Sequence, residues 1–162
     1  MRPGMLRAGR VGRAHGLDGS FHVAHPNSAL LSPGQQLMLG QSQSVVVERK
    51  GTDQRPIVRL DRLPDREAAE LARGEVLLVR REHAPELGED EWWAEDLEGC
   101  TVRSRTREVG TVIRLVALPS CEAIEIERCD GGRLLVPLVS DAVLDVDVGR
   151  RQIEIDLVFL GV

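Results

Sequence analysis

Arginine, histidine and glycine are concentrated in a short segment near the N-terminus. Leu6–Gly19 carries cationic side chains and regularly interspersed glycines, namely Arg7, Arg10, Arg13, His15, Gly9, Gly12, Gly16 and Gly19. Glycine permits positive φ and close approach of another backbone, and arginine is suited to bind phosphate. We expect this segment to contact an RNA backbone or groove, mainly through Arg10, Arg13, His15, Gly16 and Leu17. The alternative is a hairpin whose glycines serve only its tight turns.

A second candidate site lies just past the middle of the chain, where an acidic stretch, residues 89–99, holds both tryptophans. Neighbouring side chains of a strand point to opposite faces. Trp92 and Trp93 are therefore not both expected in a core, and we predict that at least one indole is available to a partner.

Motifs of catalysis, nucleotide binding and metal binding are missing from the sequence. The glycine spacing fits neither G-x-G-x-x-G nor G-x-x-x-x-G-K-[ST], and no G-x-S-x-G or H-E-x-x-H occurs. His22 and His25 are three residues apart, so in a strand they face opposite sides and do not share a metal. We predict no catalytic residue, no cofactor and no metal, although Asp96, Asp141, Asp145 and Asp147 leave an acid-base pair open.

The three cysteines, Cys100, Cys121 and Cys129, are odd in number and form no C-x-x-C motif. This argues against a disulfide framework or a zinc knuckle. We expect them to be reduced and mostly buried. The sequence also lacks a signal-peptide-like apolar run and any stretch of 18 apolar residues, so we expect a soluble, cytoplasmic protein.

Charge is distributed unevenly along the 162 residues. Residues 1–80 carry 12 Lys and Arg against 8 Asp and Glu, a net +4, whereas residues 81–162 carry 9 against 18, a net −9. A basic half suits a phosphate-rich partner and an acidic half suits a cationic protein. The alternative is a solvated surface with uneven charge.

Short apolar runs separated by turn residues predict an all-β fold in two small barrels. The first domain is expected over residues 1–80, with one helix at 64–74 that begins after Asp65 and ends at Gly74. Residues 81–91 contain Pro85 and Gly88 and predict a linker. The second barrel is expected over residues 92–162, with an Asp130-Gly131 hairpin turn and a strand at 152–157.

Four segments, in this order, resemble the RimM family of bacterial ribosome maturation factors. They are Gly9–Gly19, Asp65–Leu71, Glu89–Gly99 and Leu135–Val139. The resemblance spans nearly the whole chain. It implies an N-terminal six-stranded antiparallel barrel of the translation-factor type, followed by a PRC-barrel domain.

The resemblance also implies a function. It suggests a protein that binds the immature small ribosomal subunit and its basic head protein uS19, and that assists head maturation and 16S rRNA processing without catalysis. Trp92 and Trp93 would bind the ribosomal protein, although the family usually has two tyrosines at these positions. We expect a monomer.

Two rival functions remain open on the sequence alone. One is a flavin- or nucleotide-binding enzyme built on the N-terminal barrel. The other is a PRC-barrel adaptor for another partner, in which the glycine-rich segment would have no role.

Overall fold

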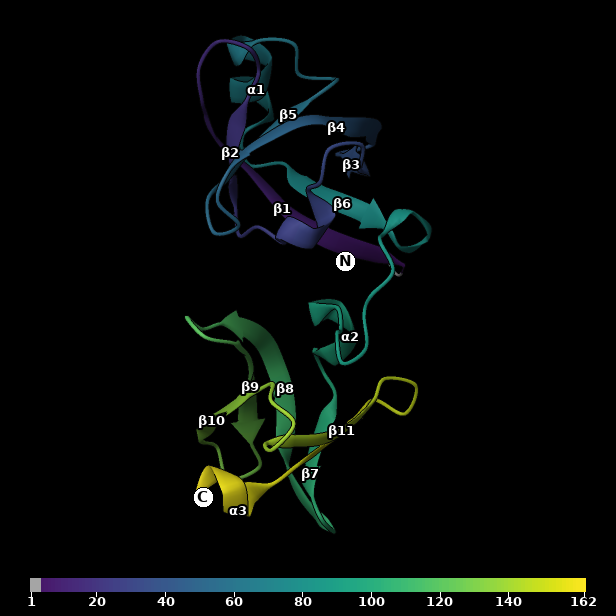
Figure 1. Ribbon diagram of the computed structural model, residues 1–162, viewed down its shortest axis with the longest axis vertical. Helices are drawn as coiled ribbons and strands as arrows, with labels where there is room; N and C mark the ends of the chain where they lie inside the picture. Colours follow the sequence, from purple (N-terminus) through teal and green to yellow (C-terminus); the bar gives the residue numbers. More distant parts are fainter. Residues whose placement is uncertain (1–3) are drawn as a thin grey trace. The chain divides into compact units, whose positions relative to one another are not determined.

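The computed structural model describes residues 4–162, which divide into two compact units (Figure 1). The first unit ends at Leu87 and the second spans Gly88–Val162. The boundary falls inside the segment 81–91 that we predicted as a linker, and the exact limits of the two domains stay a prediction. Each unit has its own sheet and core.

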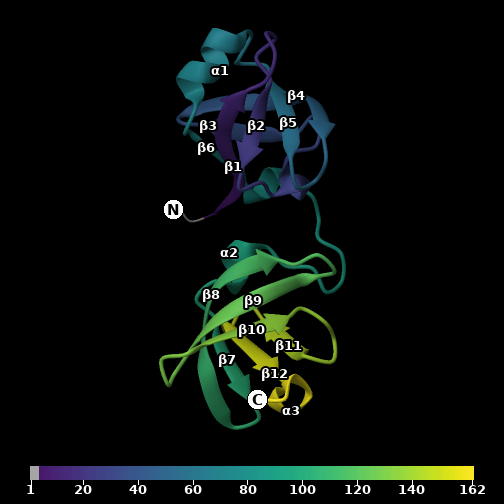
Figure 2. The ribbon, with the colours of Figure 1, turned by 90° about the vertical axis from the view of Figure 1, so that its left-hand side faces the viewer.

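Six strands form a closed barrel in the first unit (Figure 2). They are β1 (Met5–Ala14), β2 (Phe21–Ala24), β3 (Gln36–Leu39), β4 (Ser42–Gly51), β5 (Pro56–Leu60) and β6 (Val76–Arg80). They follow the order β1-β2-β5-β4-β3-β6, and β6 pairs back with β1. Every pair is antiparallel, which confirms the predicted fold of this half.

The barrel interior is filled by aliphatic side chains and a single phenylalanine. Leu6, Phe21, Val58, Leu77 and Val79 are each fully buried. Alternation along the strands produces this core, because side chains at every second position face inward. With so few aromatic residues in the chain, branched aliphatic groups supply most of the buried apolar area.

One α-helix, α1 (Arg66–Ala72), lies where the sequence predicts it. The Asp65 side chain accepts a hydrogen bond from the Ala68 N–H at 2.9 Å, which satisfies one of the unpaired donors of the first turn. Gly74 follows the helix with φ +93°. Two 3-10 turns, η1 (Ser28–Leu30) and η2 (Arg81–His83), complete the first unit.

The second unit is built on one curled six-stranded sheet (Figure 2). Its strands are β7 (Thr101–Ser104), β8 (Arg107–Ala117), β9 (Glu122–Arg128), β10 (Arg133–Pro137), β11 (Val143–Asp147) and β12 (Gln152–Ile155), in the order β10-β9-β8-β7-β12-β11. Ile124, Ile126, Ile153 and Ile155 point into its core. Gly131 has φ +91° between β9 and β10, as expected of the hairpin turn.

Two short helices and one strand pairing differ from the sequence prediction. The helix α2 (Ala94–Leu97) follows the tryptophans. The strand predicted to reach Leu157 stops at Ile155, because the Asp156 side chain accepts hydrogen bonds from Val158 and Phe159 and starts α3 (Leu157–Leu160). β12 pairs in parallel with β7, across some fifty residues of sequence. No helix within residues 4–162 has the length and apolarity needed to cross a membrane.

The backbone of Gly19 lies very close to the carbonyl group of Leu63 in the first unit, and a substitution at Gly19 tests this contact. An added Cβ at Gly19, where φ is +95°, would overlap the carbonyl oxygen of Leu63. We expect Gly19→Ala to lower the free energy of unfolding by about 2–4 kcal/mol, because the left-handed backbone is strained and the contact forces a shift. Urea unfolding followed by circular dichroism measures this.

Gly16→Ala is the matched control. Gly16 also has positive φ, +72°, but an added Cβ meets nothing within 4 Å. Gly16→Ala should therefore lower the free energy of unfolding by only about 1 kcal/mol, because it adds backbone strain but no steric overlap. Equal losses in the two variants would contradict a steric role for Gly19.

Candidate functional site

Three arginines project from one outer face of β1. A regular strand would send Arg7 and Arg10, three positions apart, to opposite faces. Instead Arg7, Arg10 and Arg13 are all exposed, whereas Leu6, Ala8, Val11 and Ala14 are buried. The three arginines form what we call the arginine row.

Two β-bulges in β1 produce this arrangement. Against β6, the register steps from Arg7 opposite Leu78 to Gly9 opposite Leu77, so β1 holds one extra residue. Against β2, it steps from Val11 opposite Val23 to Ala14 opposite Phe21, and again β1 holds one extra residue. Each extra residue reverses the alternation once. The outward positions therefore recur every three residues, in phase with the arginines.

Glycine makes room for the bulges. An added Cβ at Gly12 would lie 2.5 Å from the carbonyl oxygen of His22 on β2, and one at Gly9 would overlap the side chain of Val23. Arg10 is held in place because its Nη1 donates a hydrogen bond to the Gly74 carbonyl at 2.6 Å. The Arg-Gly pattern seen in the sequence thus serves strand geometry as well as charge.

The loop that follows β1 is fixed by backbone contacts. The His15 N–H donates to Ser20 O at 2.8 Å, and the Ser20 N–H donates to Asp18 Oδ1 at 3.0 Å. Arg66, at the start of α1, donates from its backbone to Leu17 O and from its side chain to Gly16 O. The Leu17 side chain is left 81% exposed. Hydrogen bonds from Ser20, and the nearby Arg59, hold the pKa of Asp18 below its usual value.

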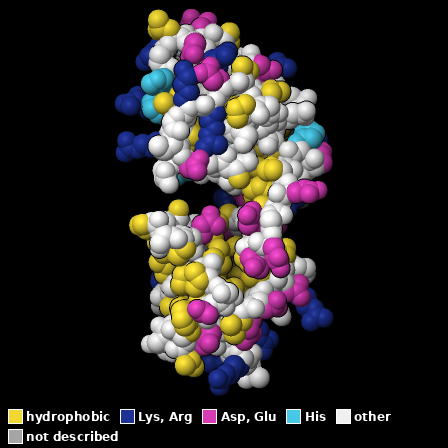
Figure 3. Space-filling model, in the orientation of Figure 1, with side chains coloured by type: hydrophobic (Ala, Val, Ile, Leu, Met, Phe, Trp, Pro, Cys, Tyr) yellow, Lys and Arg dark blue, Asp and Glu magenta, His cyan; other side chains and the backbone are white. Residues whose placement is uncertain are grey.

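The predicted RNA-contact residues come together on this surface. Arg10, Arg13, His15, Gly16 and Leu17 are all exposed and lie on β1 or the adjoining loop. Within residues 4–162, no carboxylate lies within ion-pair distance of Arg10 or Arg13, whereas Arg49 and Arg66 pair with Asp53 and Glu70. Figure 3 shows arginine or lysine and histidine side chains gathered at one edge of this unit.

The two tryptophans have different surroundings. Trp93 is 8% exposed and its backbone begins α2, where its carbonyl accepts from the Asp96 N–H at 3.0 Å. Trp92 is partly buried and packs against the core of the second unit. Trp92 is thus the indole that retains exposed area, next to the exposed carboxylates Glu89, Asp90 and Glu91.

The three cysteines differ in burial. Cys100 is buried and its pKa is raised by that burial, Cys121 is half-buried, and Cys129 is exposed. The expectation of mostly buried cysteines was therefore wrong for Cys129, which follows β9 in the hairpin turn. No group of three or more metal-binding side chains occurs in the described part of the chain.

Comparison with known proteins identifies both units. The family model of the RimM N-terminal domain matches residues 6–84, and that of the RimM PRC barrel domain matches residues 94–158. The chain is thus a two-domain protein with a closed N-terminal barrel and a PRC barrel domain.

Full-length relatives define the family. The chain is 31% identical over 153 residues to a ribosome maturation factor RimM of Sorangium cellulosum, covering 90% of each chain. It is also 31% identical over 157 residues to one of Anaeromyxobacter sp., covering 93% of this chain and 94% of the relative. The chain belongs to the RimM family of ribosome maturation factors. A solution structure of the N-terminal domain of RimM from Thermus thermophilus matches with a TM-score of 0.44, at 19% identity, over 52% of this chain and 98% of that one.

The histidine pair beside the arginine row yields a pH test. The rings of His15 and His22 meet edge to face, with centroids 5.3 Å apart. Burial, followed by the charges of His15, Arg13 and Arg55, lowers the pKa of His22 from 6.5. The folded protein therefore protonates His22 less readily than the unfolded chain does. The resulting stability is present above pH 6.5 and is lost as the pH falls from 6.5 towards the folded pKa.

We expect Arg13→Gln to raise the pKa of His22 part of the way back towards 6.5, because burial remains the largest cause of the shift. An NMR titration of the His22 ring protons measures it. Arg73→Gln removes an arginine that is not among those causes, so it should leave the titration unchanged. An unaltered pKa in Arg13→Gln would contradict the proximity of the two charges.

Proposed function

We propose that this protein assists maturation of the small ribosomal subunit by binding, without catalysis. In this proposal it binds the immature subunit and the basic head protein uS19, and so supports head maturation and 16S rRNA processing. Family membership supports a role in ribosome maturation. The observation that carries the proposal further is the arginine row, which presents charges of one sign along one strand.

The first unit is proposed to contact rRNA. Phosphate contacts by arginine position a protein on nucleic acid without reading sequence. The exposed guanidinium groups of Arg10 and Arg13 have no carboxylate partner among the described residues, so a phosphate would not have to displace an ion pair. His15, Gly16 and Leu17 extend the same surface onto the loop.

The second unit is proposed to hold uS19. Residues 88–162 carry 8 Lys and Arg against 16 Asp and Glu, a net charge of −8, which suits a basic ribosomal protein and favours fast association. The half-buried indole of Trp92 offers apolar area that a partner can cover. Trp93 is too buried to offer a comparable surface, so we assign it to support of α2 and Trp92 to contact.

The rival functions have a direct test each. A flavin enzyme would show bound flavin in the visible absorption spectrum of the purified protein. An adaptor for another partner would capture neither uS19 nor small-subunit precursors in a pull-down.

We further propose that the protein acts in the cytoplasm and that it is a monomer. Light scattering of the purified chain measures its oligomeric state.

Replacing Arg10 and Arg13 together tests the rRNA contact. We expect the double variant Arg10→Gln/Arg13→Gln to bind small-subunit precursors more weakly, and the slope of log affinity against log salt to fall by about 2, one for each lost phosphate contact. A salt titration of binding measures both effects. The matched control is Arg114→Gln/Arg133→Gln, which removes the same charge from strands of the second unit. Equal slopes in the two variants would refute the assignment.

Replacing Trp92 tests the protein contact. We expect Trp92→Ala to weaken uS19 binding by roughly 30-fold, the effect of losing about 2 kcal/mol of an aromatic anchor. Calorimetric titration with purified uS19 measures it. Trp92→Phe should keep part of the affinity, and Leu71→Ala, which truncates an exposed side chain of the first unit, should keep all of it. Undiminished affinity in a folded Trp92→Ala protein would exclude this role.

A further inference from the structure

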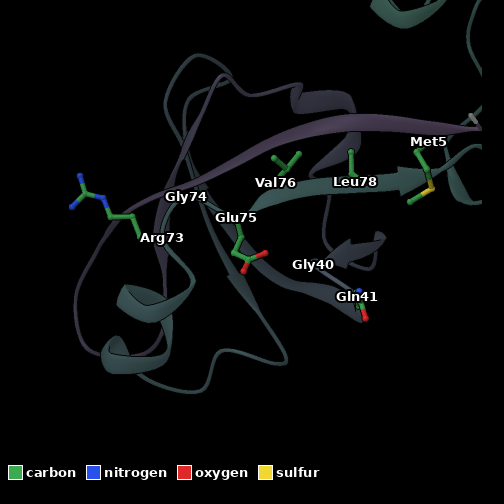
Figure 4. Close-up of a pocket in the computed structure, with 8 residues that line it drawn as sticks. All are labelled: Met5, Gly40, Gln41, Arg73, Gly74, Glu75, Val76 and Leu78. Atoms are coloured by element: carbon green, nitrogen blue, oxygen red, sulfur yellow. The ribbon is translucent and has the colours of Figure 1, made fainter. Parts of the chain in front are cut away.

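An open trough of about 600 Å³ lies on the outer face of the first barrel (Figure 4). Its floor is the outward face of β6, where Val76 and Leu78 alternate with the buried Leu77 and Val79. Figure 4 shows the Val76 and Leu78 side chains on the same side of the strand. Met5, at the start of β1, extends the floor. This makes a half-buried apolar strip on the outer face of the sheet.

A carboxylate stands at one side of the strip. Glu75 lies just before β6, and its Oε2 would be 3.1 Å from a Cβ added at Gly40, in the turn between β3 and β4. The absence of a side chain at Gly40 therefore leaves room for the Glu75 carboxylate. No described residue donates a hydrogen bond to the Glu75 side chain or pairs with it. The Gln41 side chain lies next to this turn (Figure 4).

The arginine row borders the other side. Arg7 is paired with Leu78 and Arg10 with Val76 across the β1–β6 ladder, and paired residues of an antiparallel ladder project from the same face. Arg10 also donates to the carbonyl of Gly74, which lines the trough. From β1 to β3 is two strand spacings, roughly 10 Å. Cations and a carboxylate thus flank an apolar strip at a separation that a single nucleotide can bridge.

We propose that this trough is a subsite for one unpaired guanine of rRNA, with its phosphates on the arginine row. The inference rests on the proposed function and adds to it a base-reading element. Unstacked bases are recognised by stacking on aromatic side chains or guanidinium planes, and flipped bases also by stacking against apolar side chains, together with hydrogen bonds to their Watson–Crick edges. Here the base would lie over Val76 and Leu78 with its edge turned to Glu75.

The chemistry of the carboxylate selects guanine. Guanine presents two adjacent donors, N1–H and N2–H, which match the two oxygens of Glu75. Adenine and cytosine each offer one amino donor next to an unprotonated ring nitrogen, and uracil flanks its single N–H with carbonyl oxygens. Glu75 would repel a phosphate or other anion in the part of the trough next to it, whereas an anion beside Arg10, or beside Arg73 at the end of the trough, would be attracted. The same charge pattern favours RNA over an acidic peptide.

Base preference of the full-length protein tests the proposal. The probes are a uridine pentamer and the same pentamer with guanosine or inosine at its centre, with binding measured by fluorescence anisotropy at fixed salt. We expect the guanosine pentamer to bind roughly tenfold more tightly than the uridine pentamer. Inosine, which lacks the N2 amino group, should fall between them. Amide signals of Gly40, Gln41 and Glu75 should shift in NMR spectra on adding the guanosine pentamer.

Two glutamine variants with the same change of charge separate base reading from electrostatics. Glu75→Gln should reduce the guanosine preference to nearly none. Glu67→Gln, on the exposed first turn of α1, should raise affinity for all the pentamers alike and keep the preference. A preference that survives in Glu75→Gln, or that is missing from the unmodified protein, overturns the subsite.

Failure of the subsite and failure of the proposed function give different results. If binding depends on Arg10 and Arg13 but ignores the base, the subsite is wrong and the rRNA contact stands. If precursor binding is also unaffected by the loss of both arginines, the proposed rRNA contact fails with it. Tight binding of flavin mononucleotide that displaces the guanosine pentamer would assign the trough to a different ligand and refute the proposal.

Discussion

Closure of the first barrel is the constraint on which its surface depends. β1 has a neighbour on each edge, β2 and β6, so the backbone N–H and C=O groups along it must be satisfied on both sides. Two bulges, one against each neighbour, bend and twist this ten-residue strand so that it can follow the small barrel and pair along both edges. The bulges keep the apolar positions inward while the outward positions fall at intervals of three. Hydrogen bonding in the barrel wall thereby sets which charges reach the solvent.

The second unit is organised by apolar packing on one face of its sheet, which Leu97 of α2 joins. Leu97 and Cys100 are fully buried in its core, and Trp92 packs on the outside of the same cluster. Glu89, Asp90 and Glu91, which precede the tryptophans, remain exposed because carboxylates are costly to bury. An indole held at the edge of a core, among solvated carboxylates, combines apolar area with a favourable field for a cationic protein. This arrangement follows from two adjacent residues of which only one, Trp93, is deeply buried.

Local rules in the sequence predicted much of this structure. Asp65 and Gly74 mark the ends of α1, and Asp130-Gly131 marks a hairpin, because capping and turn geometry each act over a few residues. The parallel pairing of β7 with β12 was not predictable in this way, since it depends on contacts between distant segments. The common face of the arginines also escaped prediction, because bulges show only in the register of neighbouring strands. The trough over β6 was not predicted either, because the segments that line it are far apart in the sequence.

The hydrogen bonds between Arg66 and the loop at Gly16 and Leu17 would affect the kinetics and entropy of the proposed rRNA binding. A surface loop that orders only when its partner arrives loses about 1–2 kcal/mol of backbone conformational entropy per residue. Here that loss has already occurred during folding, since the start of α1 holds two consecutive carbonyls of the loop. The exposed Leu17 side chain has only its own rotamers left to restrict. A partner that bound this loop, as proposed, would therefore meet a preorganised protrusion, which favours a small entropic penalty and an encounter that needs no prior rearrangement.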